Sequence, residues 1–396
     1  MSSPSPAAKF YYAAFEVASA LAGRFPMHFH RRRDRTPTPF EPTGYPMFFA
    51  SDNWAGAHPD IAASLVEHAG GFASAYGTSD LDRSVERKFS EIFERDVAVL
   101  FVGTGTAANS LSLASLSKPG GIAFAHREAH IVVDECGAPE YLSGSLRLSP
   151  VDGPTGKMTA ANLRAGISRF APEIVHDGRP VAVSLTQATE AGTVYSLEEI
   201  EVLAGIAREF GLPVHMDGAR FANALVALDA TPAEMTWKRG IDILSFGGTK
   251  NGCWCAEAVV LFNPSGAKDF GFLRKRAAQL FSKSRFIAAQ FDAYFRDELW
   301  LANARHANAM AMRLAAAFRA SNAARLAWEP GANEVFAILS KSAIKAAQAA
   351  GAAFYEWHTP ADLKDDVSEH ETLCRFVTSF ASTAEDVDGF AALIRQ

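Results

Sequence analysis

The 396-residue chain lacks most of the features that mark disulfide-stapled, membrane-spanning or nucleic-acid-binding proteins. Its four cysteines are spaced neither as a disulfide framework nor as a paired zinc motif, so we expect reduced thiols in a cytoplasmic protein. No apolar run approaches the roughly 18 residues that a membrane span needs. The formal net charge is −6 and the one dense basic cluster is Arg31–Arg33, which predicts no nucleic-acid partner and no membrane partner.

The composition is that of an ordinary globular protein, with 48% hydrophobic and 21% charged residues. We expect residues 1–46 to be an extension, either disordered or the product of a start assigned before Met47, although Lys9–Leu21 has a short helical pattern. The remainder predicts a large domain at 60–291, and a small domain built from 47–59 together with 292–396.

Short apolar runs alternate with helical patterns over most of the chain. The strand candidates are Val97–Val102, Ile122–Ala125, Val181–Leu185, Pro213–Met216, Ile243–Phe246 and Ala258–Phe262. Helical periodicity separates several of them, for example at Leu197–Phe210. This alternation predicts an α/β fold with a mostly parallel sheet covered by helices on both faces.

The last hundred residues have a different pattern. Helical runs at Phe286–Leu301 and Asn303–Phe318 lead into strand candidates at Val335–Leu339, Ala353–Trp357 and Phe376–Phe380. We therefore expect a smaller α+β domain at the C-terminus.

Polar and glycine-rich segments follow four of the predicted strands. They are Gly103–Asn109, Thr186–Glu190, Asp217–Arg220 and Gly247–Gly252. Ligands of open parallel sheets bind outside the carboxyl ends of the strands, so these segments are where chemistry is expected.

Three of these segments match the needs of pyridoxal 5′-phosphate. Backbone amides at Gly105, Thr106 and Ala107 suit a phosphate group, because small residues at a helix N-terminus let an anion approach. Asp217 is placed to keep a pyridine nitrogen protonated, so that the ring can accept electrons. Lys250 stands among glycines and can form a Schiff base with the cofactor aldehyde.

Two alternatives use the same residues. Gly103, Gly105 and Ala108 after a strand also fit a dinucleotide fingerprint, with Glu128 as the ribose acid. His215 and Asp217 lie two residues apart, which would put two metal ligands on one face of a strand. Neither alternative gives a role to the combination of Asp217, Arg220 and Lys250, so we expect no metal site.

Several longer motifs resemble those of the threonine aldolase family. His215–Ala224 is similar to its aspartate motif, and Ser245–Gly252 to the Schiff-base motif of its low-specificity bacterial branch. Phe49–Asn53, Ala129–Glu140 and Leu185–Glu190 resemble further stretches of that branch. The similarity runs from about residue 48 to the C-terminus and leaves out the first 46 residues.

The resemblance implies a pyridoxal-phosphate lyase of fold type I that cleaves L-threonine, L-allo-threonine and related β-hydroxy-α-amino acids to glycine and an aldehyde. It implies a homo-oligomer, a tetramer built as a dimer of dimers. A β-eliminating lyase or an aminotransferase would share the cofactor residues, and a NAD-dependent dehydrogenase is the more distant alternative.

The resemblance also assigns residue roles. His130 would stack on the cofactor ring, and either His130 or a water near it would act on the substrate hydroxyl. The expected cofactor-binding set adds Gln187, which lies where some members carry a histidine, and Arg220. Spacing leaves open whether Lys283 or Arg285 reaches the phosphate. The expected substrate-binding set is Ser51, Arg220 and Arg375 for the carboxylate, and Tyr76 from the neighbouring subunit.

Overall fold

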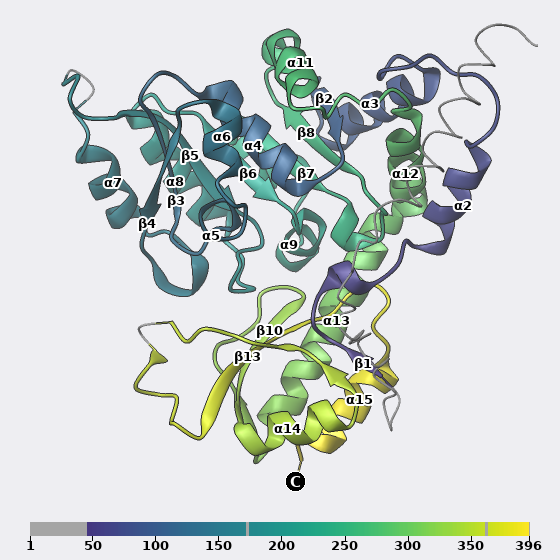
Figure 1. Ribbon diagram of the computed structural model, residues 1–396, viewed down its shortest axis with the longest axis vertical. Coiled ribbons are helices and arrows are strands. Elements are labelled where there is room, and N and C mark those ends of the chain that lie inside the picture. The colour runs from purple at the N-terminus through teal and green to yellow at the C-terminus, as the bar shows by residue number, and fades with distance from the viewer. Residues whose placement is uncertain (1–45, 172–173, 361–362, 396) are drawn as a thin grey trace, which may run out of the picture. The chain divides into compact units, whose positions relative to one another are not determined.

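The computed structural model describes residues 46–171, 174–360 and 363–395 (Figure 1). All of these lie in one unit, Thr43–Gln396. The expectations for residues 1–45, including the helical pattern at Lys9–Leu21, lie outside the described part of the chain.

A seven-stranded sheet carries the larger part of the fold. Its strands lie in the order β2-β8-β7-β6-β5-β3-β4. Their bounds are β2 Ala98–Val102, β3 Gly121–His126, β4 Arg147–Val151, β5 Arg179–Thr186, β6 Val214–Gly218, β7 Ile243–Gly247 and β8 Glu257–Leu261. The pairs from β7 through β4 are parallel, whereas β8 is antiparallel to both of its neighbours. This confirms the mostly parallel sheet.

Helices cover both faces of this sheet, and the alternation along β2 shows why. Val99 and Phe101 belong to one core cluster, while Leu100 and Val102 belong to another on the opposite face. The first cluster is closed by α3 Asp80–Ile92, α7 Ala160–Ser168, α8 Leu197–Glu209, α9 Phe221–Leu228 and α12 Arg285–Phe295. The opposite face is closed by α4 Gly105–Leu116, α5 His130–Val133 and α11 Ala267–Arg276. In the described residues, no helix is long and apolar enough to cross a membrane.

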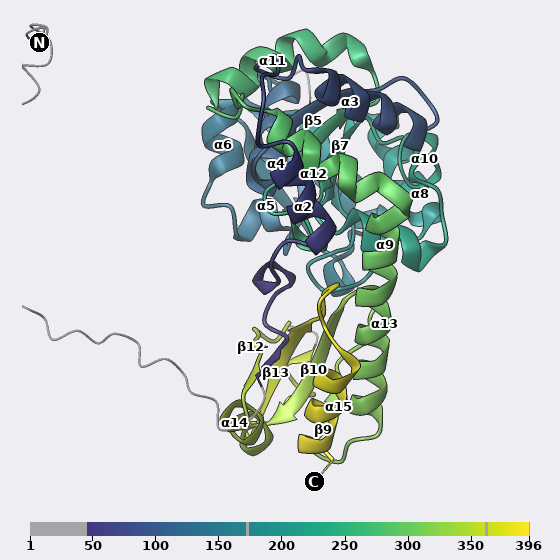
Figure 2. The same ribbon diagram turned by 90° about the vertical axis from the view of Figure 1, so that its right-hand side faces the viewer.

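The C-terminal part builds a second, smaller sheet, as expected. Four antiparallel strands lie in the order β12-β13-β10-β9, and β1 pairs with β11 in a separate parallel pair. Their bounds are β1 Met47–Phe48, β9 Ala324–Leu326, β10 Glu334–Ser340, β11 Ala352–Ala353, β12 Tyr355–Glu356 and β13 Glu371–Val377. A second core packs between these strands and α13 Leu299–Arg319, α14 Lys341–Ala349 and α15 Ala384–Leu393 (Figure 2).

Three expected elements differ in the structure, and one strand of the seven-stranded sheet was not predicted. The strand expected at Ala353–Trp357 is two short strands, β11 and β12. The strand expected at Phe376–Phe380 is Glu371–Val377, because Ser379 already begins a turn in which the Ser382 amide donates to its carbonyl at 3.1 Å. The helix expected at Phe286–Leu301 ends at Phe295, since Asp297 and Glu298 take φ angles of 49° and 56°. Strand β4 was not predicted: it is an edge strand with an exposed side and a proline, Pro150, which weakens its apolar signal.

Candidate active site

The N-terminus of α4 follows β2 directly. The Thr104 hydroxyl accepts a hydrogen bond from the Ala107 amide at 3.1 Å, which starts the helix and occupies that amide. The amides of Gly105 and Thr106, in the same first turn, have no carbonyl partner within the helix. Gly103 lies so close to the 279–281 segment that a Cβ there would stand 2.9 Å from the Phe281 ring. Two of the three expected amides are therefore free to bind an anion.

Asp217 in β6 is a buried carboxylate with complete hydrogen bonding. It is 2% exposed, and its Oδ2 accepts from Asn109 Nδ2 at 2.8 Å. Its Oδ1 accepts from the Ala219 amide at 3.0 Å. These donors fix the orientation of the carboxylate at the carboxyl edge of the sheet.

His130 is linked to Asp217 through two further side chains. Its Nδ1 lies 2.9 Å from Glu135 Oε1, which also accepts from Asn109 Nδ2 at 2.9 Å. The hydrogen bond to Glu135 raises the pKa of His130, and burial opposes this. Asn109 Oδ1 and Glu135 Oε2 are buried and have no partner among the described residues. The chain Asp217–Asn109–Glu135–His130 thus crosses from β6 to α5.

Lys250 follows β7 in a short 3-10 turn, Thr249–Asn251, and is half-buried. The turn lies against the segment after Asp217: a Cβ on Gly247 would stand 2.6 Å from the Ala219 carbonyl oxygen. The ammonium group acts electrostatically on both His130 and Asp52: it helps to lower the pKa of Asp52, and it opposes the rise that the Glu135 hydrogen bond causes in the pKa of His130. Lys250 therefore lies within charge range of both the Asp217–His130 chain and the arginines described next.

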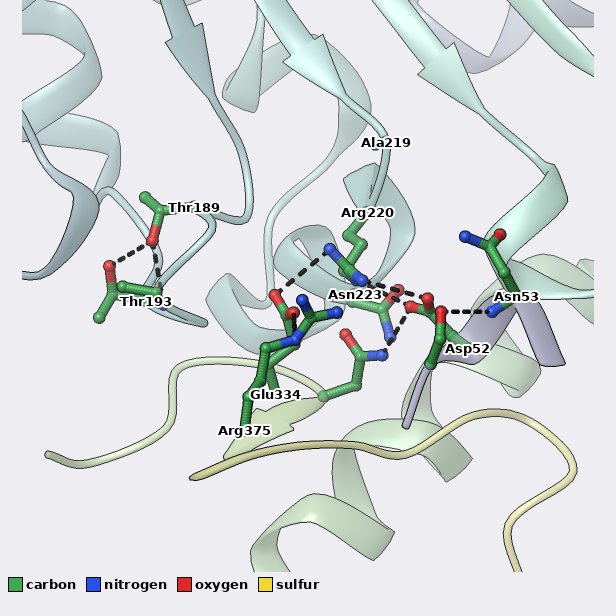
Figure 3. Close-up of polar contacts among 12 residues, drawn as sticks. Asp52, Asn53, Thr189, Thr193, Ala219, Arg220, Asn223, Glu334 and Arg375 are labelled. Atoms are coloured by element: carbon green, nitrogen blue, oxygen red, sulfur yellow. Dashed lines mark hydrogen bonds and ion pairs between the residues drawn. The ribbon is translucent and has the colours of Figure 1, made fainter. Parts of the chain in front are cut away.

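Arg220 lies at the start of α9 and is buried against two carboxylates (Figure 3). Its Nε donates to Asp52 Oδ2 at 2.7 Å and its Nη2 to Asp52 Oδ1 at 3.1 Å. Its Nη1 lies 3.3 Å from Glu334 Oε2. Burial disfavours the charge, but Asp52 and Glu334 outweigh it and raise the pKa of Arg220.

Arg375 on β13 approaches the same carboxylate from the small sheet. Its Nε lies 3.2 Å from Glu334 Oε1, and its guanidinium carbon lies 4.7 Å from the centre of the Trp357 ring. Figure 3 shows Glu334 lying between the two arginines. A guanidinium stacked on an aromatic ring is held flat, which leaves its two Nη groups for a ligand.

A cavity of about 870 Å³ lies next to Arg375, because Trp357, whose ring contacts the Arg375 guanidinium, forms part of the cavity wall. One wall comes from the loops that follow β3, β4 and β5 and carries Glu128, Asp152 and Glu190, together with Asp134 at the end of α5. The other comes from the small sheet, with Trp328, Phe336 and Trp357. It has the size of a small-molecule site.

The structure does not bring every expected residue to this group. Gln187 is buried, and its side chain bonds the Tyr195 backbone, donating to the carbonyl at 2.9 Å and accepting from the amide at 3.0 Å. The Arg285 guanidinium faces the carbonyls of residues 69–71, whereas Lys283 is exposed. Both nitrogens of His215 lie 2.9 Å from serine hydroxyls, and burial lowers the pKa of His215 to about 4, so it is a packed side chain.

Two expected substrate residues, Ser51 and Tyr76, form hydrogen bonds with residues outside the Asp217–His130 chain and the arginine cluster. Ser51 precedes Asp52, and its hydroxyl accepts from the Asn53 amide at 3.1 Å. Tyr76 is 50% exposed, and its amide donates to the Ser282 carbonyl at 3.1 Å, next to Lys283. Tyr76 therefore lies against the segment that carries Lys283.

Sequence reasoning missed the partners of the expected residues. These are Asp52, Asn109, Glu135, Asn333 and Glu334. Signals did exist for some of them: Asp52, Asn109 and Glu135 lie inside the motifs already singled out. Glu334 directly precedes the apolar run Val335–Leu339, which is an unusual place for a charge.

The fold and the site define a class. The chain has a mostly parallel sheet with Lys250, the buried Asp217 and His130 at its carboxyl edge. Two arginines that share the carboxylate of Glu334 lie next to them. The family model described as "Beta-eliminating lyase" matches residues 49–342, and the chain belongs to that family.

Similar proteins narrow the comparison further. The chain is 41% identical to a low specificity L-threonine aldolase from Pseudomonas aeruginosa, over 79% of this chain and 90% of the relative. It is 40% identical to a protein of the same name from a Pseudomonas species, over 78% and 88%. A solved threonine aldolase structure from Leishmania major superposes with a TM-score of 0.81 at 27% identity, covering 88% of this chain and 98% of that one. The resemblance inferred from the motifs is confirmed.

Proposed function

We propose that the chain cleaves L-threonine, L-allo-threonine and related β-hydroxy-α-amino acids between Cα and Cβ, yielding glycine and an aldehyde with pyridoxal 5′-phosphate as cofactor. One observation carries this proposal: Lys250, Asp217 and His130 are gathered beside Arg220 and Arg375 in a chain of the beta-eliminating lyase family.

The residues fit the cofactor. The free amides of Gly105 and Thr106 would bind its phosphate, and Lys250 would hold its aldehyde carbon. Asp217, whose two oxygens are oriented by Asn109 and Ala219, would stabilise a protonated ring nitrogen. When bound, the cofactor supplies an electron sink for the pair released as the Cα–Cβ bond breaks.

His130 takes the proton from the substrate hydroxyl. Because its Nδ1 is bonded to Glu135, Nε2 is the nitrogen available for this step. Glu135 stabilises the imidazolium and raises the pKa of His130, which makes it a stronger base than a free imidazole.

Arg375 binds the substrate carboxylate through its Nη groups, and Ser51 lies close by. Held flat on Trp357, the guanidinium fixes the orientation of the substrate and thereby selects which bond at Cα is broken. The cavity lined by Trp328, Phe336 and Trp357 receives the β-substituent. Arg220 is bound to Asp52 and Glu334, and through Glu334 it helps to hold Arg375 in position.

We extend the proposal to assembly and location. Tyr76 and Lys283 contact the active site of a second copy, in a homotetramer built as a dimer of dimers, and Lys283 reaches the phosphate because Arg285 is engaged with the carbonyls of residues 69–71. Exposed aromatic side chains such as Phe72 and Trp254 support such an interface. The protein is cytoplasmic, in keeping with its four unpaired cysteines. Analytical ultracentrifugation and cell fractionation test these two points.

The reaction itself is tested by product analysis. The purified protein, loaded with pyridoxal phosphate, is given threonine, allo-threonine and phenylserine. Stoichiometric glycine and aldehyde are expected. An oxo acid with ammonia would indicate β-elimination, and an oxo acid with an aminated cofactor would indicate an aminotransferase; either would overturn the proposal.

A further inference from the structure

Glu334 is a buried carboxylate that makes no hydrogen bond. Both of its oxygens are buried and without a hydrogen-bond partner in the described part of the chain, although Arg220 Nη1 and Arg375 Nε lie 3.3 Å and 3.2 Å away. The side chain is fixed by its strand and by the loop after β5: a Cβ on Gly192 would stand 2.9 Å from the Glu334 Cβ. Its charge is therefore balanced by ion pairing alone.

The neighbouring carboxylate, Asp52, is held quite differently. It accepts two hydrogen bonds from Arg220 and a third from Asn333 Nδ2 at 3.1 Å. Burial disfavours its charge, but Arg220 and Lys250 outweigh burial and lower the pKa of Asp52. Burial raises the pKa of Glu334, and the two arginines oppose that shift only in part. Of the two carboxylates, Glu334 is the one that protonates more readily.

Counting charges shows what a substrate carboxylate would do here. The charged groups that face Glu334 are Arg220, Arg375, Asp52 and Glu190. The two arginines are balanced by Asp52 and Glu334, and the charge of Lys250, which acts on Asp52, is balanced by that of the half-buried Glu190. A third buried carboxylate, that of the substrate on Arg375, adds an uncompensated negative charge, which is costly in a desolvated site.

We propose that Glu334 takes up a proton when the substrate carboxylate binds Arg375, so that the arginine cluster keeps its charge balance. Glu334 is then a positioning residue: it holds the arginines while the site is empty and gives up its charge when the site fills. This inference rests on the proposed function, because it needs an amino-acid substrate on Arg375.

The consequence is a pH-dependent affinity for carboxylates. A site that binds one proton together with its ligand loses up to about tenfold in affinity per pH unit, over the range between the pKa of Glu334 in the empty site and its higher pKa in the filled site. Below that range, and above it, affinity no longer depends on this proton.

The test compares two amines that differ in the carboxylate. Dissociation constants of glycine and of ethanolamine are measured calorimetrically on the holoenzyme between about pH 6 and about pH 9, a window chosen to bracket a raised carboxyl pKa. The ratio of the ethanolamine constant to the glycine constant isolates the contribution of the carboxylate. In the parent enzyme this ratio is expected to fall as pH rises, by up to about tenfold per unit. A ratio that does not change with pH overturns the proposal.

Glu334→Gln imitates the protonated side chain at nearly the same volume. Its ratio is expected to be independent of pH, and to exceed that of the parent by about tenfold or more at the alkaline end. Glu86→Gln, at a half-buried glutamate outside the site whose pKa is also raised by burial, is the matched control and should keep the slope of the parent. Glu190→Gln shows whether Glu190, which faces Glu334, takes up the proton instead. A parent-like slope in Glu334→Gln, or loss of the slope in Glu190→Gln alone, would assign the proton elsewhere.

A second measurement needs no variant. Titrations in two buffers with different ionisation enthalpies count the protons taken up, and glycine should take up as much as one more than ethanolamine. Equal counts overturn the proposal even if Glu334→Gln fails to fold. If neither amine binds, the proposed function fails; if both bind with a ratio independent of pH, only this inference fails.

Discussion

Two buried carboxylates at the site, Asp217 and Glu334, are held in opposite ways. Asp217 accepts hydrogen bonds on both oxygens, at 2.8 Å and 3.0 Å. Glu334 has two arginines nearby, and neither of its oxygens accepts a hydrogen bond from any residue that the structure describes. Hydrogen bonds from fixed donors stabilise the ionised form of a carboxylate. A buried carboxylate that has only ion pairs is protonated more easily. We infer that the Asp217 carboxylate is held in a fixed orientation for the cofactor, while the charge of Glu334 responds to what binds.

The largest effect is expected at Lys250, which together with Asp217 forms the part of the site that we assign to the cofactor. Lys250→Ala should lower turnover by about four orders of magnitude, the upper end of what one positioned acid–base group contributes. The fold and the phosphate site should remain, because the backbone amides at Gly105 and Thr106 are unchanged. Steady-state assays with a thermal unfolding control check this, and the exposed Lys268→Ala is the matched variant. Turnover within about tenfold of the parent would remove Lys250 from the chemistry.

Asp217→Asn tests whether turnover needs a negative charge at this position. The amide keeps the shape of the side chain but cannot stabilise a protonated ring nitrogen, so turnover should fall by about a hundredfold, or nearly 3 kcal/mol in the barrier. The Michaelis constant should change much less, because the carboxylate clamp is elsewhere. A loss confined to the Michaelis constant would contradict the assignment.

The contrast also explains what could be predicted from sequence. Asp217, Lys250 and the Gly105–Ala107 turn follow buried apolar strands, and the rule that parallel strands end at one edge places them together. Glu334 and Asn333 could not be placed, because they stand at and just before the start of an antiparallel strand, β10, whose position depends on contacts far along the chain. Strand β13 was misplaced for a similar reason: its half-buried polar residues interrupt the apolar pattern, and pairing with β10 decides its bounds.

Gln187 shows the limit of the strand-end rule. It follows β5 as expected, yet its side chain turns into the protein and satisfies the Tyr195 backbone. Position at a strand end predicts where the backbone is, not where a long side chain points.

Arg375→Lys tests the part of the site that we assign to the substrate carboxylate. An ammonium cannot reproduce the planar fork of a guanidinium, so the Michaelis constant should rise by about tenfold, equivalent to about 1.4 kcal/mol of binding. The turnover number should fall less, and the yield of glycine relative to side products should decrease, because a loosely held carboxylate no longer selects the broken bond. Unchanged constants and product ratio would move the clamp to Arg220.

Asn109→Ala should have a more modest effect on turnover. The Asn109 Nδ2 group donates to both Asp217 and Glu135, so the variant removes one donor from each of two buried carboxylates. We expect a loss of about 2 kcal/mol in the free energy of unfolding and about a tenfold fall in turnover. Denaturant titration measures the first, with the exposed Asn322→Ala as control. A stability equal to that of the parent would mean that water replaces the amide, and the link between Asp217 and His130 would lose its support.

The smallest effect concerns the pair of His130 and Glu135, at the far end of the same chain. Glu135 raises the pKa of His130 in the folded protein, and a raised pKa means that protonation stabilises the fold. That contribution is complete below the pKa of an unfolded histidine, about 6.5, and is lost as pH rises through the higher folded value. The difference in unfolding free energy between the parent and Glu135→Gln should therefore be larger at about pH 5.5 than at about pH 9, and the titration of His130 followed by NMR should shift to lower pH in the variant. The exposed Glu369→Gln, beside exposed His370, should show no such trend, because solvent screens that pair. A His130 pKa that is the same in the parent and in Glu135→Gln would mean that the hydrogen bond orients the ring but does not stabilise the imidazolium. The base would then have to be a water molecule near His130.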